Sequence, residues 1–201
     1  MQIQAFTVGM LATNCYVVNC EATKEAIIID PGIEATSEAE QIFRYVEQGM
    51  LKVKFIVNTH GHPDHISGDS LLKKKYGAPI CIHPYDAHCL HGLDAATQPA
   101  NVMLADGMAL GFGKVTLKVL LTPGHTPGSV SLLGERLVFT GDTLFAGSIG
   151  RTDFPGGSDH DMQCSLRKLL SLPDYYVVYP GHGAPSTIGE EKRFNPFLQW
   201  L

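Results

Sequence analysis

Three histidines and one aspartate lie within six residues of this chain, in the run HGHPDH at positions 60–65. Imidazole and carboxylate groups are the ligands that zinc, iron and related divalent metal ions take in proteins. The run directly follows segment 53–57, whose apolar and β-branched residues predict a buried strand. The chain must therefore fold so that the end of a strand presents several potential metal ligands together.

Three other predicted strands end in the same way. Segment 115–121 leads to His125 in the loop TPGHTPG, segment 137–140 leads to Asp142, and segment 175–179 leads to His182 in the loop PGHG. Glycine and proline near each of these residues allow short, sharply turning loops to converge at one place. The candidate ligands are five histidines and two aspartates: His60, His62, Asp64, His65, His125, Asp142 and His182.

The number of candidate ligands predicts two metal ions rather than one. A tetrahedral ion takes about four ligands, whereas seven side chains suffice for two ions that share an oxygen ligand. A histidine-rich surface loop, or core histidines with satisfied hydrogen bonds, is the alternative interpretation. The agreement among four separate strand–loop segments favours the metal site.

The remaining segments alternate between strands and helices. Apolar or β-branched runs predict further strands at 2–8, 14–19, 25–29, 79–82 and 129–133. Helical spacing of apolar residues predicts helices at 35–48, 67–76, 159–171 and from about residue 189. This order predicts an α/β protein in which helices cover the faces of sheets. The length of 201 residues suits a single domain over 1–201, and segment 83–107 shows no clear pattern.

Charge and hydropathy argue against several classes of partner. The net charge of −5 argues against nucleic acid, which requires a basic surface. Apolar runs are too short for a membrane span, and the first residues lack the basic and apolar regions of a signal peptide. Five dispersed cysteines without a Cys-x-x-Cys pair fit reduced thiols better than a disulfide framework. We therefore expect a cytoplasmic protein that acts on a small molecule.

The motifs together resemble the metallo-β-lactamase superfamily, and within it the glyoxalase II-like hydrolases. The resemblance covers nearly the whole chain and rests on segments 59–65, 124–128, 141–142 and 180–183, in that order. The turn Asp30-Pro31-Gly32 and the run GSIGRTD at 147–153 also match the small bacterial members. The resemblance implies a four-layer αββα sandwich. In this fold two mixed sheets pack face to face with helices outside, and the metals lie at one edge of the sheets.

The resemblance also implies a role for each candidate ligand. The first metal ion would be held by His60, His62 and His125, and the second by Asp64, His65 and His182. Asp142 would bridge both ions together with a water or hydroxide. Zinc is the expected metal, and iron or manganese would suit the same ligands.

The implied reaction is hydrolysis of a small thioester, with S-2-hydroxyacylglutathione as the expected substrate. A hydroxide that bridges the two metals would attack the carbonyl carbon, since metal ions lower the pKa of bound water to about 7. Asp64 and Asp142 are the expected catalytic carboxylates, and the thiol leaves as a thiolate. Persulfide dioxygenases are similar in the same motifs and also keep the residues of the second group, but they use one iron held by two histidines and an aspartate, here His60, His125 and Asp142. The sequence leaves this oxygenase function as the alternative.

Three further residues have two interpretations each. Asp30 would orient an imidazole from behind the ligands, although a simple Asp-Pro-Gly turn explains it equally well. Arg151 would contact the substrate carboxylate, but an ion pair with Asp153 is favoured. Phe154 would line the mouth of the site or anchor its own loop. Full-length glyoxalase II enzymes bind much of the glutathione through a C-terminal helical domain, which this chain is expected to lack.

Overall fold

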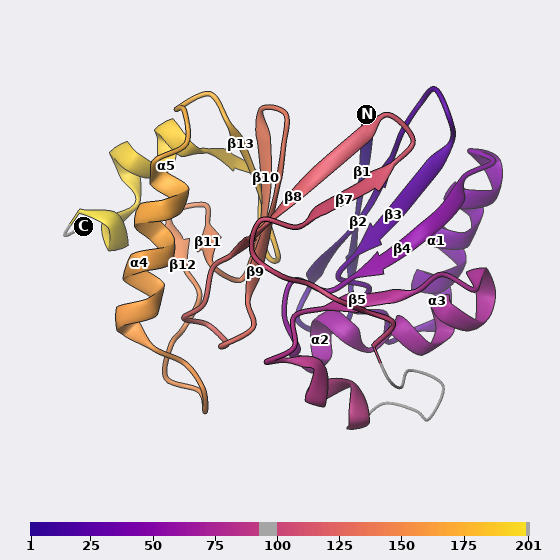
Figure 1. The fold of residues 1–201 in the computed structure, drawn as a ribbon, viewed down its shortest axis with the longest axis horizontal. Coiled ribbons are helices and arrows are strands. Elements are labelled where there is room, and N and C mark those ends of the chain that lie inside the picture. The colour runs from indigo at the N-terminus through magenta and orange to yellow at the C-terminus, as the bar shows by residue number, and fades with distance from the viewer. Residues whose placement is uncertain (93–99, 200–201) are drawn as a thin grey trace.

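Two sheets of six strands each lie face to face, and helices cover the outer face of each sheet (Figure 1). The computed structural model describes residues 1–92 and 100–199. Both sheets contain parallel and antiparallel pairs. The predicted α/β class and the four-layer αββα sandwich are therefore confirmed.

The first sheet has the strand order β1-β2-β3-β4-β5-β6. Strands β1, β2 and β3 pair antiparallel, whereas β3 to β6 pair parallel. The strands span Gln2–Val8 (β1), Thr13–Asn19 (β2), Glu25–Ile29 (β3), Lys52–Val57 (β4), Ile80–Ile82 (β5) and Val102–Met103 (β6). The helical elements of this half are α1 (Thr36–Gln48), α2 (Pro63–Ile66), α3 (Asp69–Tyr76) and η1 (Ala87–Gly92).

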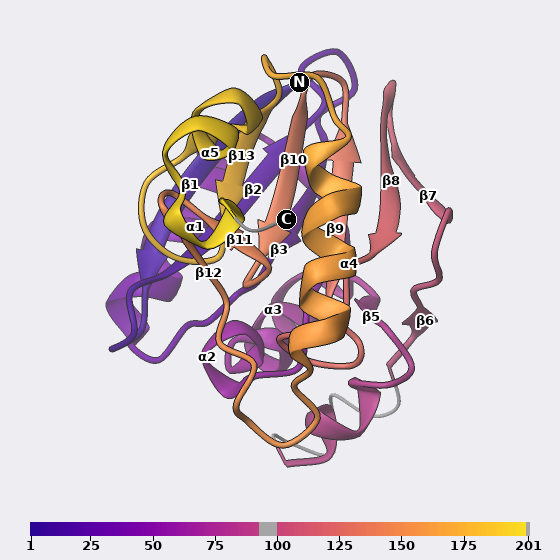
Figure 2. The ribbon, with the colours of Figure 1, turned by 90° about the vertical axis from the view of Figure 1, so that its left-hand side faces the viewer.

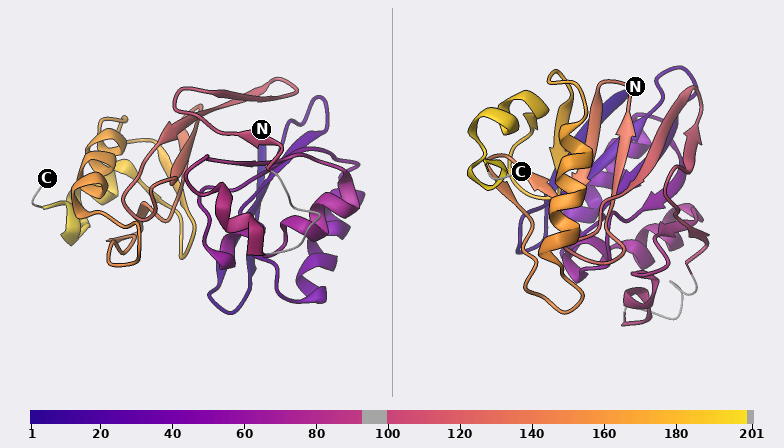
Figure 3. Two further views of the ribbon diagram at one scale, coloured as in Figure 1. Left: turned by 60° about the horizontal axis from the view of Figure 1, so that its bottom comes forward. Right: turned by 60° about the vertical axis from the view of Figure 1, so that its left-hand side comes forward.

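The second sheet has the order β14-β13-β10-β9-β8-β7. Its strands span Ala109–Phe112 (β7), Val115–Leu121 (β8), Val130–Gly134 (β9), Leu137–Gly141 (β10), Val177–Pro180 (β13) and Ser186–Thr187 (β14). Strands β11 (Leu144–Phe145) and β12 (Ser148–Ile149) form a separate small hairpin. Helices α4 (Asp159–Leu170), α5 (Ile188–Phe194) and η3 (Pro196–Leu198) belong to this half. Figure 2 shows α4 in front of this sheet, and Figure 3 shows the two halves side by side.

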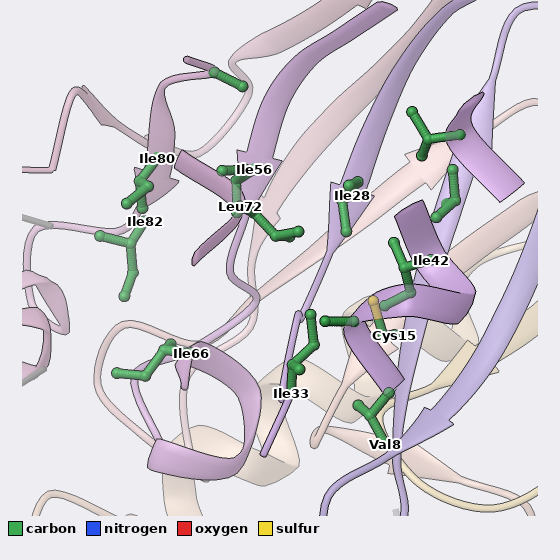
Figure 4. Packing of buried hydrophobic residues seen from close by; sticks show 14 of the residues in the cluster. Val8, Cys15, Ile28, Ile33, Ile42, Ile56, Ile66, Leu72, Ile80 and Ile82 are labelled. Carbon is green, nitrogen blue, oxygen red and sulfur yellow. The ribbon is translucent and has the colours of Figure 1, made fainter. Parts of the chain in front are cut away.

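Successive side chains of the strands point to alternate faces and thereby build separate cores. On β3, Ile27 and Ile29 lie between the two sheets, whereas Ile28 points toward the helices α1 and α3. Figure 4 shows this helix-side cluster, in which Ile56 and Leu72 accompany Ile28. Burial of each such side chain stabilises the fold by about 1.5–3 kcal/mol. The buried strands are thus rigid supports for the loops that follow them.

Tyr16 connects the two sheets close to one of the predicted ligand loops. Its ring lies on β2 and packs edge-on against Phe139 of β10, with ring centroids 5.1 Å apart. Its hydroxyl donates a hydrogen bond of 2.6 Å to the carbonyl of Pro180, which immediately precedes the loop that carries His182. The interior of the sandwich therefore fixes where this loop begins.

Most predicted elements are present with small shifts at their ends. The strands at 2–8, 25–29 and 115–121 have the predicted bounds. The predicted helix 67–76 is wrong at its start: Ser67 follows the separate helix α2, and α3 begins at Asp69. The Gly68 amide donates to the carbonyl of Pro31, which marks this break between the helices. Helix α2 and the two-residue strands β6, β11, β12 and β14 were not predicted.

The helices and the cysteines bear on where the chain is expected to reside. No helix in the described ranges is both long and apolar enough to cross a membrane. All five cysteines are free thiols, as expected. Of the segment 83–107, for which the sequence shows no pattern, residues 93–99 lie outside the described part.

Candidate metal centre

Backbone hydrogen bonds join the ends of three strands to one another or to the starts of two neighbouring strands. The amide of Asn14 on β2 donates to the carbonyl of Gly181 at 2.7 Å, and the amide of Gly181 donates to Gly141 at 2.8 Å. The amide of Val130 on β9 donates to the carbonyl of Thr59 at 2.8 Å. These bonds bring the ends of β4, β10 and β13 to one edge of the sandwich, where the predicted ligands follow.

Helix α2 presents Asp64 and His65 to the same edge. Pro63 begins the helix, a position where its missing N–H costs nothing. The carbonyl of Asp64 packs so closely on Gly32 that a Cβ at that position would lie 1.6 Å from the carbonyl oxygen. The Asp30-Pro31-Gly32 turn therefore determines how closely α2 approaches the first sheet.

The structure brings all seven predicted ligands together. His60, His62 and His125 form one group whose ligand atoms lie within 4.8 Å of one another, and Asp64, His65 and His182 form another. Asp142 lies between the groups. Its Oδ1 is 3.4 Å from Nε2 of His65, and its Oδ2 is 3.5 Å from Nε2 of His125 and 3.4 Å from Nε2 of His182.

The donor atoms fit divalent metal ions. Nε2 of His60 lies 3.1 Å from Nδ1 of His62, and Nε2 of His65 lies 3.2 Å from Nε2 of His182. Two nitrogens that bind one tetrahedral zinc are about 3.3 Å apart, given bonds of about 2.0–2.1 Å. Nε2 of His125 and Oδ1 of Asp142 are buried and lack a hydrogen-bond partner among the described residues. A metal ion would satisfy both atoms.

The second ring nitrogens of two histidines are held by backbone carbonyls. Nδ1 of His125 lies 2.8 Å from the carbonyl oxygen of Arg151, and Nδ1 of His182 lies 3.0 Å from that of Leu11. A carbonyl accepts only, so each Nδ1 must carry the proton that it donates. This leaves the lone pair of each neutral ring on Nε2, which is the arrangement that metal ligation needs.

Asp30 contacts both the turn at the end of β4 and one of the candidate ligands. Its carboxylate accepts hydrogen bonds of 2.7 Å from the amide and from the hydroxyl of Thr59, which fixes the turn at the end of β4. Its Oδ2 also lies 3.0 Å from Nδ1 of His65. The backbone of Asp30 adopts a φ of 50°, a left-handed conformation that Asp and Asn tolerate better than most residues.

Opposite charges face one another within the centre. Burial and the neighbouring ring of His65 lower the pKa of His60 well below its usual range. Burial acts to raise the pKa of Asp142, but the attraction of His65 and His182 prevails and holds that pKa well below its usual range. Hydrogen bonds to Asp142 and Asp64 raise the pKa of His182 to about 9. The carboxylates thus favour positive charge on the neighbouring histidine rings, at positions that also suit a metal cation.

A pocket of about 340 Å³ opens beside these ligands. Leu11, Phe145, Arg151 and Phe154 contribute to its walls. Arg151 forms the predicted ion pair with Asp153 through two hydrogen bonds of 2.7 Å, and its guanidinium lies 3.9 Å from the ring centroid of Phe154. Leu11 and Phe145 could not be predicted from sequence, because an isolated apolar residue in a turn or a two-residue strand gives no functional signal.

Comparisons with known proteins place the same motifs in a family. The family model described as "Metallo-beta-lactamase superfamily" matches residues 8–182. The "Hydroxyacylglutathione hydrolase GloC" of Haemophilus influenzae is 36% identical over an alignment of 213 residues including gaps, which covers 98% of each chain. The "Probable metallo-hydrolase YqgX" of Bacillus subtilis is 32% identical over 212 residues, again 98% of each chain.

Solved structures are similar over nearly the whole chain. The BLEG-1 B3 metallo-β-lactamase has a TM-score of 0.90 and 34% identity, covering 98% of this chain and 100% of its own. ETHE1 from Myxococcus xanthus has a TM-score of 0.86 and 33% identity, covering 98% and 84%. TTHA1623 in a di-iron-bound form has a TM-score of 0.83 and 36% identity, covering 97% and 100%.

Proposed function

The chain belongs to the metallo-β-lactamase superfamily, and from this premise we propose that it hydrolyses small thioesters of the S-2-hydroxyacylglutathione type at a centre of two divalent metal ions. The observation that carries the proposal is the presence of two complete ligand groups that meet at Asp142. The second group of Asp64, His65 and His182 offers a set of ligands for a second ion beside the first. The similarity to a hydroxyacylglutathione hydrolase supports the choice of substrate.

The residues divide between two ions as the groups suggest. His60, His62 and His125 would hold the first ion, and Asp64, His65 and His182 the second, with Asp142 shared. When bound, such ions supply a Lewis acid for the carbonyl oxygen and lower the pKa of water to about 7. Zinc is the metal we propose. Iron suits histidine and aspartate ligands too, and the similar protein TTHA1623 has a di-iron-bound form.

The chain's own residues position the reactants. Asp64 is half-buried at the pocket and accepts a hydrogen bond of 3.1 Å from the hydroxyl of Thr13. Its Oδ2 also lies 3.3 Å from Nε2 of His182, which places the carboxylate at the second ligand group, where it would steer the proton of an attacking water. The apolar walls formed by Leu11, Phe145 and Phe154 would bury the acyl group and exclude bulk water. A thiol with a pKa near about 8.5 leaves as a thiolate without a strong proton donor.

Metal analysis and a substrate panel test the proposal. Purified protein loaded with zinc should contain two ions per chain and should hydrolyse S-2-hydroxyacylglutathione faster than a lactone, a β-lactam or a phosphodiester. Asp142→Ala should lower kcat/KM by on the order of 100-fold or more, because it removes the shared ligand. Glu40→Ala, which removes an exposed carboxylate of α1, is the control. Full thioesterase activity in Asp142→Ala would refute the two-metal proposal.

The alternative function is that of an iron-dependent persulfide dioxygenase. His60, His125 and Asp142 lie close enough together to form the two-histidine, one-carboxylate set of such enzymes. Iron-loaded protein supplied with glutathione persulfide would then consume oxygen, whereas a hydrolase would consume none. Oxygen uptake by a protein that leaves the thioester intact would favour this alternative over the hydrolase.

A further inference from the structure

Asp86 is a buried carboxylate that the sequence motifs do not include. It lies between β5 and η1, in the segment where the sequence shows no clear pattern, and is 2% exposed. A buried carboxylate is costly unless hydrogen-bond donors surround it. Its hydrogen-bond partners therefore indicate what this carboxylate does at this position.

Within the described part of the chain, the carboxylate of Asp86 accepts three hydrogen bonds. Oδ2 accepts from the amide of Gly61 at 2.9 Å and from the hydroxyl of Thr126 at 2.6 Å. Oδ1 accepts from the amide of Gly128 at 2.9 Å. Gly61 lies between His60 and His62, and Thr126 directly follows His125. One carboxylate thus joins the two loops that carry the whole first ligand group.

The two loops belong to different sheets, and glycine allows the carboxylate to reach both. The loop with Gly61 follows β4 of the first sheet, and the loop with Gly128 connects β8 and β9 of the second. A Cβ at Gly128 would lie 2.5 Å from the carboxylate of Asp86, and a Cβ at Gly61 would lie 2.7 Å from Sγ of Cys89. A larger residue at either position would push the loop away from Asp86.

We propose that Asp86 is a positioning residue that sets the spacing of His60, His62 and His125 by fastening their two loops together. The inference rests on the proposed two-metal function, since it assigns Asp86 to the first ion alone. The second ion's ligands Asp64, His65 and His182 lie on α2 and after β13, and among the described residues Asp86 makes no hydrogen bond with them. Loss of Asp86 should therefore lower the affinity for the first ion and leave the affinity for the second ion unchanged.

Asp86→Asn removes the function of this carboxylate with the least change in shape. An amide has one oxygen and one NH2 group. In either orientation, the NH2 group must face at least one donor among Gly61, Thr126 and Gly128. The substitution therefore loses at least one hydrogen bond and leaves a buried donor unpaired.

Asp69→Asn is a matched control. Asp69 is also fully buried, and Asn58 donates a hydrogen bond of 2.5 Å to its Oδ2. Burial raises the pKa of Asp69 well above its usual range, which favours the neutral carboxyl group, and asparagine has a closely similar shape. The bond from Asn58 can be kept by the amide oxygen. The control therefore tests whether any substitution of a buried aspartate disturbs metal binding.

The experiment isolates each ion before it tests Asp86. His182→Ala removes a ligand of the second group and leaves the first ion for measurement, whereas His62→Ala leaves the second. In each background, zinc affinity is measured for the full chain by competition with a chromogenic chelator, with and without Asp86→Asn. We expect about a tenfold or larger loss of affinity in the His182→Ala background. No loss is expected in the His62→Ala background or with Asp69→Asn.

A second pair of variants keeps the test valid if Asp86→Asn does not fold. Thr126→Val removes one of the three hydrogen bonds to Asp86 and should lower the affinity of the first ligand group for zinc. Thr126→Ser keeps the hydroxyl and should retain the wild-type affinity. Equal loss of both ions, or no loss of either, would overturn the inference. A protein that binds both ions and hydrolyses no thioester would instead overturn the proposed function alone.

Discussion

His65 lies between two carboxylates on opposite sides of its ring. Nδ1 is 3.0 Å from Oδ2 of Asp30, and Nε2 is 3.4 Å from Oδ1 of Asp142. Burial acts to lower the pKa of His65, but these two carboxylates prevail and raise it well above the usual range. Asp30 thereby holds the ring in the orientation that points Nε2 at the candidate metal site.

Asp30→Asn should weaken metal binding and leave the local backbone intact. Asparagine tolerates the left-handed conformation of residue 30 but supplies no second carboxylate oxygen for Nδ1 of His65. Replacement of such a partner of a metal ligand costs about 10–100-fold in metal affinity or activity. Zinc competition measures the change, with Asp69→Asn as the buried control. Wild-type affinity in Asp30→Asn would show that Asp30 is only a turn residue.

Zinc affinity should rise with pH up to about pH 9. The hydrogen bonds to Asp142 and Asp64 raise the pKa of His182 to about 9, so a proton competes with the metal for Nε2 at neutral pH. Each displaced proton makes the affinity rise about tenfold per pH unit below that pKa. Calorimetry in two buffers of different ionisation enthalpy should detect the released protons. An affinity that is constant between about pH 7 and about pH 9 would contradict this assignment.

The same pKa predicts the opposite trend for the stability of the metal-free protein. The pKa of His182 in the fold, about 9, exceeds its ordinary value of 6.5. Protonation of His182 therefore stabilises the metal-free fold fully below about pH 6.5. This contribution is lost as the pH rises through about 9. Thermal unfolding of chelator-treated protein at several pH values measures it.

Arg151 should affect the Michaelis constant of carboxylate-bearing substrates more than their turnover. Its guanidinium is exposed at the pocket mouth and is occupied by Asp153, so a substrate carboxylate must compete with Asp153 for it. Arg151→Ala should raise KM for S-2-hydroxyacylglutathione several-fold, and Asp153→Ala should lower KM. A neutral thioester without a carboxylate is the control substrate. If Arg151→Ala raises KM equally for both substrates, the side chain acts only through its packing on Phe154.

The ligand positions could be predicted from sequence because their signal is local. His60, His62 and Asp64 lie in one run, and His125 and His182 each follow a strand whose β-branched residues are visible in the sequence. The strands themselves were predictable because their successive side chains are buried on the two faces of the sheet, so that the strands are visible as apolar runs in the sequence. The sequence therefore indicates which strand ends carry the ligands, and the rigid sandwich brings those ends together.

Residues that act through distant partners left no such signal. Asp86 is separated by 25 residues from Gly61 and by 40 from Thr126, and its own segment shows no periodicity. Strands β11 and β12 have two residues each, too few for a pattern, although Phe145 on β11 lines the pocket. Such positions depend on tertiary contacts, so only the folded structure reveals them.

Gly32→Ala should displace helix α2 and thereby remove the second ligand group. A Cβ at position 32 would lie 1.6 Å from the carbonyl oxygen of Asp64, and backbone atoms cannot give way as a flexible side chain can. The helix must shift, and Asp64 and His65 move with it. Gly111→Ala is the control, because the space around that β7 position is open and its φ is ordinary.

The stoichiometry of bound zinc distinguishes local from global effects of Gly32→Ala. We expect one ion per chain, held by His60, His62 and His125, and a loss of thioesterase activity, while Gly111→Ala keeps both ions. Overpacking at a tight backbone contact costs about 1–3 kcal/mol or more, so thermal unfolding should also occur at a lower temperature. Two ions per chain in Gly32→Ala would show that α2 tolerates the shift and that Gly32 does not determine the position of the second ligand group.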